Sequence, residues 1–224
     1  MAPELSLFGL AELPPSKRSD LPEFRYFPDP VAAGSIVPLN EPCCLCGQAR
    51  GWAHAGKIYM HHRLIEPVCP WCIASGALLA DGFDYDALES IHNEHCGSGL
   101  NELHVPEQFD ELPLQTIMEV EICTPGIPSW QDFLWPVCCG GVCVFLGFAG
   151  GKEIMGKWRN ILDIIGFEMV DLFGSIENFA HAATKANQRG QGFVYVFRCE
   201  RCKGLHPEWN LDSDPEDDPS EGWL

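Results

Sequence analysis

Cysteine pairs separated by two residues constrain this chain more than any other feature of its sequence. Cys43 and Cys46 form one pair, and Cys69 and Cys72 form a second pair after a spacer of 22 residues. Two intervening residues let a tight turn present both thiolates to one ion, and two such turns supply a tetrahedral four-thiolate site. Gly47 follows Cys46 directly and suits the turn that closes such a knuckle. The spacing therefore predicts a structural zinc ion bound by these four cysteines.

A second zinc site is expected in the C-terminal half of the chain. Cys199 and Cys202 repeat the two-residue spacing at the end of an apolar stretch that is typical of a strand. Their partners are expected from the cluster that contains Cys138, Cys139 and Cys143. We expect Cys139 and Cys143 to be the ligands and leave open that Cys138 takes the place of Cys139. The chain would then hold two structural zinc ions.

Redox chemistry is the alternative interpretation of the second cysteine pair. The sequence Cys69-Pro70-Trp71-Cys72 is similar to a thioredoxin-type site, in which a helix N-terminus lowers the pKa of one thiol. The βαβ pattern that such a site requires is not evident around it, and a second pair lies at metal-binding spacing. Metal binding is therefore favoured. Three further cysteines have no such spacing and are expected to be ordinary thiols: Cys44, Cys96 and Cys123.

The cellular compartment follows from the same cysteine count. The chain has 12 cysteines, and its first residues lack the basic and apolar regions of a secretory signal. No apolar run reaches the roughly 18 residues of a membrane-spanning helix. We therefore expect a cytoplasmic protein. Reductants in the cytoplasm keep thiols reduced, so metal binding is the better explanation for the excess of cysteine.

The balance of charge limits the possible partners. Lys and Arg number 14 against 32 Asp and Glu, a formal net charge of −18. Such a field repels a phosphate backbone, so direct nucleic-acid binding is not expected. An acidic protein suits solubility or attraction to a basic protein. Residues 81–86 place aromatic and acidic side chains together, as in a solvated turn or a partner-binding loop; the candidate contacts are Asp81, Phe83, Asp84, Tyr85 and Asp86.

Apolar patterning predicts an α+β fold with small mixed or antiparallel sheets and helices, braced by the two zinc knuckle sites. We expect a flexible leader over 1–23, a zinc-binding domain over 24–210 with sub-sites at 40–80 and 130–204, and an acidic tail over 211–224. The predicted elements are a hairpin over 52–59, a helix from Pro113, strands within 130–148, a helix from Ser175 to Gly190, and a strand over 192–199.

No catalytic motif is evident in the sequence. It contains neither a phosphate-binding loop nor a GxSxG nucleophile turn. Both predicted zinc sites take all four ligands from the protein, which leaves no open position for activating water. The sequence therefore predicts a binding protein, with an enzyme as the less favoured alternative.

A set of motifs, in order along the chain, resembles the CbrC family of bacterial proteins. The set runs from Phe24-x-Tyr26-x-Pro28-Asp29-Pro30 through both N-terminal cysteine pairs to Tyr195-Val196-Phe197-Arg198-Cys199-x2-Cys202. It also contains Thr124-Pro125-Gly126, Trp130-Gln131 and Phe145-Leu146-Gly147. Members of that family commonly have His where this chain has Cys138, which supports Cys139 and Cys143 as ligands.

The resemblance also implies a function. The family name is associated with tolerance to a colicin, and its members are similar to candidate immunity proteins of toxin systems. This implies that the chain neutralises a cognate toxin, such as a basic nuclease, by covering its active surface. Immunity proteins against nucleases are commonly strongly acidic, which agrees with the net charge of −18. A zinc-braced adaptor for an endogenous protein partner is the alternative.

Overall fold

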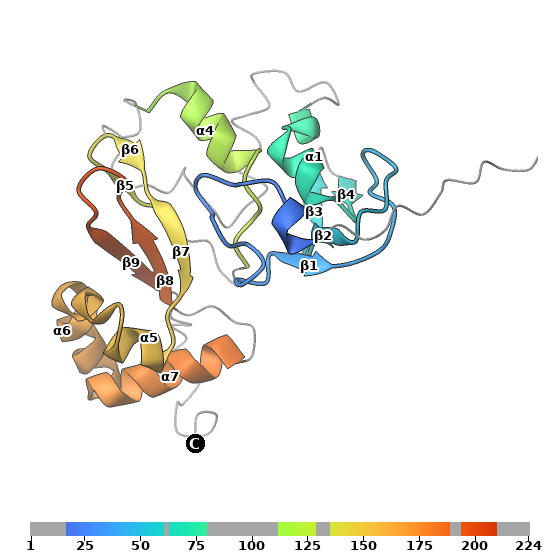
Figure 1. The fold of residues 1–224 in the computed structure, drawn as a ribbon. Helices are drawn as coiled ribbons and strands as arrows, with labels where there is room; N and C mark the ends of the chain where they lie inside the picture. The colour runs from blue at the N-terminus through green and yellow to red at the C-terminus, as the bar shows by residue number, and fades with distance from the viewer. Residues whose placement is uncertain (1–16, 61–62, 80–111, 129–134, 189–193, 210–224) are drawn as a thin grey trace, which may run out of the picture.

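A three-stranded antiparallel sheet separates two differently built parts of the protein (Figure 1). The computed structural model describes residues 17–60, 63–79, 112–128, 135–188 and 194–209, and the structural statements below concern these ranges. A cysteine-rich part with short strands and helices lies on one side of the sheet, and a group of helices lies on the other. This arrangement confirms the predicted α+β class with small antiparallel sheets.

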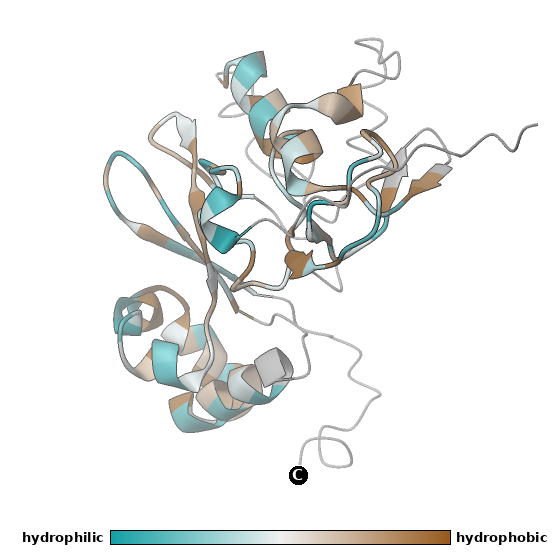
Figure 2. Cartoon of the chain, turned by 45° about the vertical axis from the view of Figure 1, so that its right-hand side comes forward, coloured by the Kyte–Doolittle hydropathy of each residue, from teal (hydrophilic) through white to brown (hydrophobic). Residues whose placement is uncertain are grey.

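The central strand of the sheet is buried on both faces. Strands β7 (Val144–Phe148), β8 (Val194–Arg198) and β9 (Leu205–Trp209) pair in the order β7-β8-β9. Alternate side chains of a strand point to opposite faces. In β8, Val194 and Val196 accordingly pack against the helices, while Tyr195 and Phe197 pack against the cysteine-rich part. All four side chains have 0% exposure, so other elements must pack on both faces of the strand. Figure 2 shows apolar residues along this sheet and on the elements beside it.

Several short elements make up the cysteine-rich part. Its strands are β1 (Ile36–Pro38), β2 (Trp52–His54), β3 (Ile58–Met60) and β4 (Arg63–Ile65), and its helices are α1 (Pro70–Ala74) and α4 (Leu114–Glu121). Their apolar side chains form one cluster with those of the sheet. Phe27, for example, meets Phe145 of β7 edge-on, with ring centroids 4.9 Å apart. The same cluster contains the buried cysteines Cys43, Cys69 and Cys72, so the core extends to these thiols.

The predicted hairpin over 52–59 is wrong. Strand β2 pairs with β1, with Val37 opposite Ala53, and β3 pairs with β4. The backbone N–H of Ala55 donates to the Ser35 carbonyl at 2.9 Å, and that of His54 donates to the Val68 carbonyl at 2.8 Å. Both donors are therefore satisfied by segments outside the expected hairpin. The two strands separate after His54 and join different neighbours.

Helices α5 (Gly151–Met155), α6 (Leu162–Phe173) and α7 (Ile176–Gln188) cover the other face of the sheet, with a 3-10 turn at Arg159–Ile161. The prediction of a helix starting at Ser175 is confirmed, since the N–H of Asn178 donates to Ser175 Oγ at 3.1 Å as an N-cap. A Cβ on Gly151 would lie 2.7 Å from the Ala180 carbonyl oxygen. Glycine is therefore required where α5 meets α7.

Other predicted elements are also present. The helix expected from Pro113 is α4, with Pro113 as its N-cap, and the strand expected over 192–199 is β8. The strands expected within 130–148 are β5 (Val137–Cys138), β6 (Gly141–Val142) and β7. The candidate contacts Asp81, Phe83, Asp84, Tyr85 and Asp86 lie outside the described residues. None of the helices in the described ranges combines the length and apolar character needed to cross a membrane.

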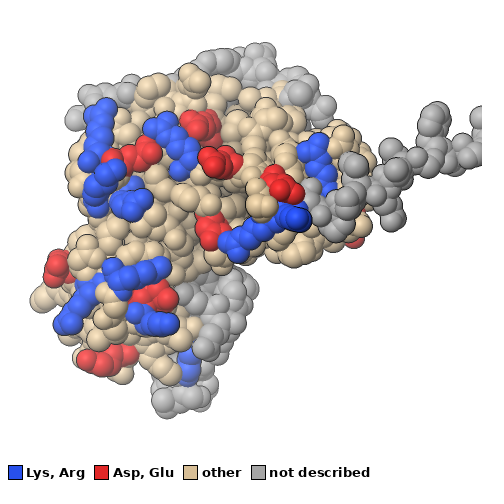
Figure 3. Space-filling view, in the orientation of Figure 1, with Lys and Arg blue, Asp and Glu red and all other residues tan. Residues whose placement is uncertain are grey.

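Negative charge is distributed unevenly along the chain. The described residues contain 14 Asp and Glu against 13 Lys and Arg, a net of −1. The other 18 acids and one base, a net of −17, fall outside these ranges, with nine acids in 80–111 and six in 210–224. On the face shown in Figure 3, acidic and basic side chains are intermixed. The formal charge of −18 is therefore a property of particular segments and not of the whole surface.

Candidate metal centres

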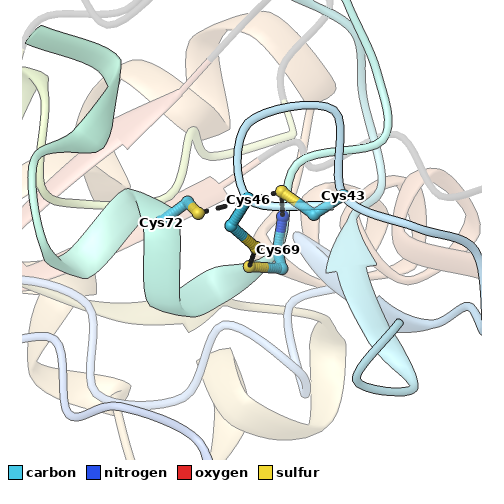
Figure 4. Close-up of side chains that lie close together, drawn as sticks. All are labelled: Cys43, Cys46, Cys69 and Cys72. Atoms are coloured by element: carbon cyan, nitrogen blue, oxygen red, sulfur yellow. Dashed lines mark hydrogen bonds between the residues drawn. The ribbon is translucent and has the colours of Figure 1, made fainter. Parts of the chain in front are cut away.

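The first cysteine group brings four sulfur atoms to one point. The Sγ atoms of Cys43, Cys46, Cys69 and Cys72 all lie within 4.8 Å of one another (Figure 4). Cys43 and Cys72 are 3.8 Å apart, as are Cys46 and Cys69. Metal–sulfur bonds of about 2.3 Å in a tetrahedron place the sulfur atoms about 3.8 Å apart. These two separations match the edges of a tetrahedral four-thiolate site, the kind of site that the sequence spacing predicts.

Backbone hydrogen bonds hold the two turns of this group in place. The Gly47 N–H donates to the Cys43 carbonyl at 2.8 Å, and Gly47 has a φ of 71°, a conformation that favours glycine. The Cys69 N–H donates to Cys43 Sγ at 3.3 Å, which ties one knuckle to the other through a ligand atom. Cys69 is the N-cap of α1, so Cys72 falls in the first turn of that helix. Such bonds to ligand sulfurs orient them for a metal.

The protonation of the four thiols also favours a bound cation. Burial would raise the pKa of Cys43, but the backbone N–H groups of Cys69, Cys46 and Leu45 outweigh burial and lower that pKa to about 7. Burial raises the pKa of Cys69 to about 11, and burial together with neighbouring thiols raises that of Cys72 further. Without a cation, four clustered thiols resist ionising together. A bound metal ion removes this penalty because it coordinates the thiolates.

The second group is formed by Cys138, Cys139, Cys199 and Cys202, whose Sγ atoms also lie within 4.8 Å of one another. Cys138 Sγ is 3.7 Å from the sulfurs of both Cys139 and Cys202. Strands β5 and β6 pair with Val137 opposite Val142, which leaves Cys139 and Gly140 as a two-residue loop. Both loop residues have positive φ, 54° and 70°, as a tight hairpin turn requires. The hairpin thus presents adjacent cysteines to one site.

The third cysteine pair completes this group from the turn between β8 and β9. The Lys203 N–H donates to the Cys199 carbonyl at 3.1 Å, and the Gly204 N–H donates to Cys202 Sγ at 3.4 Å. Arg201 Nη1 donates to the Cys139 carbonyl at 2.6 Å and joins the turn to the β5–β6 hairpin. Burial would raise the pKa of Cys199, but hydrogen bonds from the backbone N–H groups of Cys202 and Arg201 outweigh burial and lower that pKa to about 7.

The structure differs from the sequence prediction at one position, because Cys138 and not Cys143 completes this group. Cys143 follows β6 and turns into the core, where its side chain has 0% exposure. Its N–H donates to the Pro136 carbonyl at 2.9 Å, and its carbonyl accepts from Trp135 Nε1 at 2.8 Å. Burial raises the pKa of its thiol to about 12, so Cys143 stays protonated as a small apolar side chain.

Within the ranges that the structure describes, other possible ligands do not join either group. Cys44 is exposed and Cys123 is half-buried, and both lie outside the two groups. His54 Nδ1 is 2.9 Å from the Gly56 carbonyl, a bond within its own turn. Neither thiol and no ring nitrogen of His54 is therefore part of a four-cysteine group. Cys96 falls outside the described ranges.

Burial distinguishes the two groups. In the first, Cys43, Cys69 and Cys72 are buried and only Cys46 is exposed. In the second, Cys199 is buried, Cys138 is intermediate, and Cys139 and Cys202 are exposed. Solvent therefore reaches the second group more readily than the first.

This difference predicts two phases of metal loss. When the metal-loaded protein is mixed with excess chelator, the second group is expected to release its ion first and clearly faster, since competing ligands reach its exposed thiolates directly. The release is followed with a colorimetric zinc indicator. The variant Cys139→Ser should lack the fast phase and keep the slow one. A single phase in the wild type would contradict the assignment.

Fold and sites together define a mixed α+β protein with two four-cysteine groups, each able to hold a metal ion. The chain belongs to the family described as "Uncharacterised protein family (UPF0167)", whose model matches residues 21–211. It is 38% identical over 203 residues to UPF0167 protein PA1536 of Pseudomonas aeruginosa, covering 86% of this chain and 97% of that protein. It is 32% identical over 186 residues to UPF0167 protein Mb2317 of Mycobacterium bovis, covering 83% and 90%. No solved structure gives a significant match.

Proposed function

We propose that this chain is a zinc-braced immunity or tolerance protein that neutralises a basic bacterial toxin, such as a nuclease, in the cytoplasm. As part of this proposal, we take the UPF0167 family to be the same as the CbrC family that the motifs of the chain resemble. The observation that supports it most is the contrast between a nearly neutral metal-braced body and segments with a net charge of −17. The acidic segments would attract the partner, and the body would hold them in place.

Zinc is the metal that the donor set favours. Four thiolates at tetrahedral separations suit Zn²⁺, which takes four-cysteine sites as structural centres. In each group all four donors come from the protein, so a tetrahedral ion would have no position left for water or substrate. This supports a structural role for the metal and a binding function for the protein. We therefore propose no catalytic step.

The direct test is coexpression with a candidate toxin, a basic nuclease chosen from the products of neighbouring genes, in cells that the toxin alone kills. We expect survival and a stable complex on a sizing column. The association rate should fall between low and high salt, since exposed charges are screened within about 8 Å at physiological ionic strength. The dissociation rate should change less.

Two matched variants locate the attraction. Replacement of Asp84 and Asp86 by Asn, or removal of residues after Asn210, should slow association and leave the metal content unchanged. Replacement of Asp20 and Glu23, two acids of the described part, is the control and should have little effect. Continued killing without complex formation, with both proteins folded, would refute the immunity proposal. Co-purification with a native component instead would favour the adaptor function.

A further inference from the structure

Helix α6 presents an apolar stripe to solvent. Ile164, Phe167 and Val170 follow one another at intervals of three residues, which places them along one side of the helix. They are 58%, 91% and 42% exposed. On the opposite side, Ile165 and Met169 are buried at 1% and 0% in the cluster beneath the sheet. The helix is therefore apolar on two sides, and only one of them is covered by the fold.

The exposure of Phe167 is the feature that needs an explanation. A buried Phe side chain contributes about 1.5–3 kcal/mol through the area removed from water, and an isolated exposed one contributes nothing of this kind. One exposed apolar residue is ordinary, but an aligned set of three on one helix is typical of an interaction surface. The apolar stripe of Ile164, Phe167 and Val170 thus resembles the face that a helix offers to a partner.

The charges around the stripe restrict the kind of partner. Helix α6 contains Asp163, Glu168 and Asp171 and has no Lys or Arg. Asp163 and Asp171 alternate with the apolar residues along the exposed side. None of the three acids makes an ion pair among the described residues, where all four ion pairs involve other carboxylates. A partner that buries the stripe must offset these charges, because burying an unpaired carboxylate is costly.

We propose that the exposed side of α6 is a docking surface for a basic amphipathic helix of another protein. Apolar side chains of that helix would cover Ile164, Phe167 and Val170, and its Lys or Arg residues would pair with Asp163 and Asp171. Grooves and helix faces bind amphipathic helices through apolar anchors at this spacing. The inference does not depend on the immunity proposal, since any partner of this chemistry fits the surface.

Other occupants are disfavoured by charge. Residues 1–16, 80–111 and 210–224 contain 17 Asp and Glu in total and no Lys or Arg, so these segments of the same chain would meet α6 with like charge. A second copy pairing through this side of α6 would bring Asp163 and Asp171 of both copies into one interface. An anionic membrane surface would be repelled in the same way. The acids that flank the stripe therefore select a basic partner.

The test uses the full-length, metal-loaded protein and a fluorescein-labelled synthetic peptide of about 18 residues with Leu on one helical face and Lys on the other. We expect saturable binding by fluorescence anisotropy. Phe167→Ser should weaken it at least about tenfold, as truncation of a central aromatic anchor does. The double variant Asp163→Asn, Asp171→Asn should weaken binding at low salt, and the difference should shrink at high salt.

The control is Leu64→Ser, which replaces an apolar residue that is 48% exposed in strand β4 and should leave binding unchanged. Because Phe167 is 91% exposed, its replacement should not alter the melting temperature, and this is checked by circular dichroism. Equal binding by wild type and Phe167→Ser would overturn the proposal. So would dimerisation that Phe167→Ser abolishes, binding to phosphatidylglycerol vesicles, or peptide binding that appears only after residues 1–16 are removed.

Discussion

Cys72→Ser is expected to abolish the folded state of the cysteine-rich part. Cys72 is 7% exposed and lies in the first turn of α1, within the same apolar cluster as Phe27 and Phe145. Its loss removes one ligand and leaves three thiols without a complete site. A structural zinc contributes folding free energy on the order of 10 kcal/mol. Since whole domains are stable by only about 5–15 kcal/mol, the loss should be close to the entire stability.

The measurement is a thermal melt by circular dichroism together with the zinc content of the purified protein. Cys123→Ser is the matched control, because Cys123 is half-buried and lies outside both cysteine groups. It should cost about 1 kcal/mol, as typical point substitutions do, and retain both ions. Similar melting curves for the two variants would show that Cys72 is not a metal ligand.

Local signals in the sequence were sufficient for part of the fold. The N-cap hydroxyl of Ser175 defines the start of α7, and the run of apolar residues from Val194 to Phe197 defines β8. In both cases, the residues that make the signal also make the contact: Ser175 Oγ accepts an N–H, and β8 fills both cores. The first cysteine group was predictable for the same reason, since each ligand pair lies within one turn.

Features that depend on distant segments were not predictable. Helix α6 has apolar residues on its exposed as well as its buried side, so its sequence lacks the one-sided stripe of an ordinary surface helix. Strand β2 was assigned to the wrong neighbour because its partner β1 lies beyond the cysteine knuckle in the sequence. The concentration of negative charge in particular segments is visible in the sequence. The contrast between these segments and a nearly neutral body requires knowing which residues form the body, and the structure supplies that division.

The choice between Cys138 and Cys143 illustrates the same limit. Three residues separate Cys139 from Cys143, a spacing compatible with a knuckle, but strand pairing decides where each side chain points. The two-residue loop of the β5–β6 hairpin places Cys138 beside Cys139 and Cys202, whereas Cys143 enters the core.

Zinc content should therefore distinguish Cys138→Ser from Cys143→Ser. The wild type is expected to carry two zinc ions per chain by elemental analysis, one for each four-cysteine group. Cys138→Ser removes a ligand from the second group and should reduce the zinc content to one ion per chain, while the more buried first group keeps its ion. Cys143→Ser should retain two ions, and its cost should appear in stability instead.

The stability cost of Cys143→Ser has its own physical cause. The thiol has 0% exposure, and a hydroxyl placed there loses its hydrogen bonds to water, a penalty of about 1–3 kcal/mol unless a partner is found. Cys143→Ala avoids that penalty and should melt closer to the wild type, again with two ions bound. If Cys143→Ser loses an ion and Cys138→Ser does not, the ligand set is the one that the sequence spacing suggested, and the β5–β6 hairpin must have a different register in the metal-bound protein.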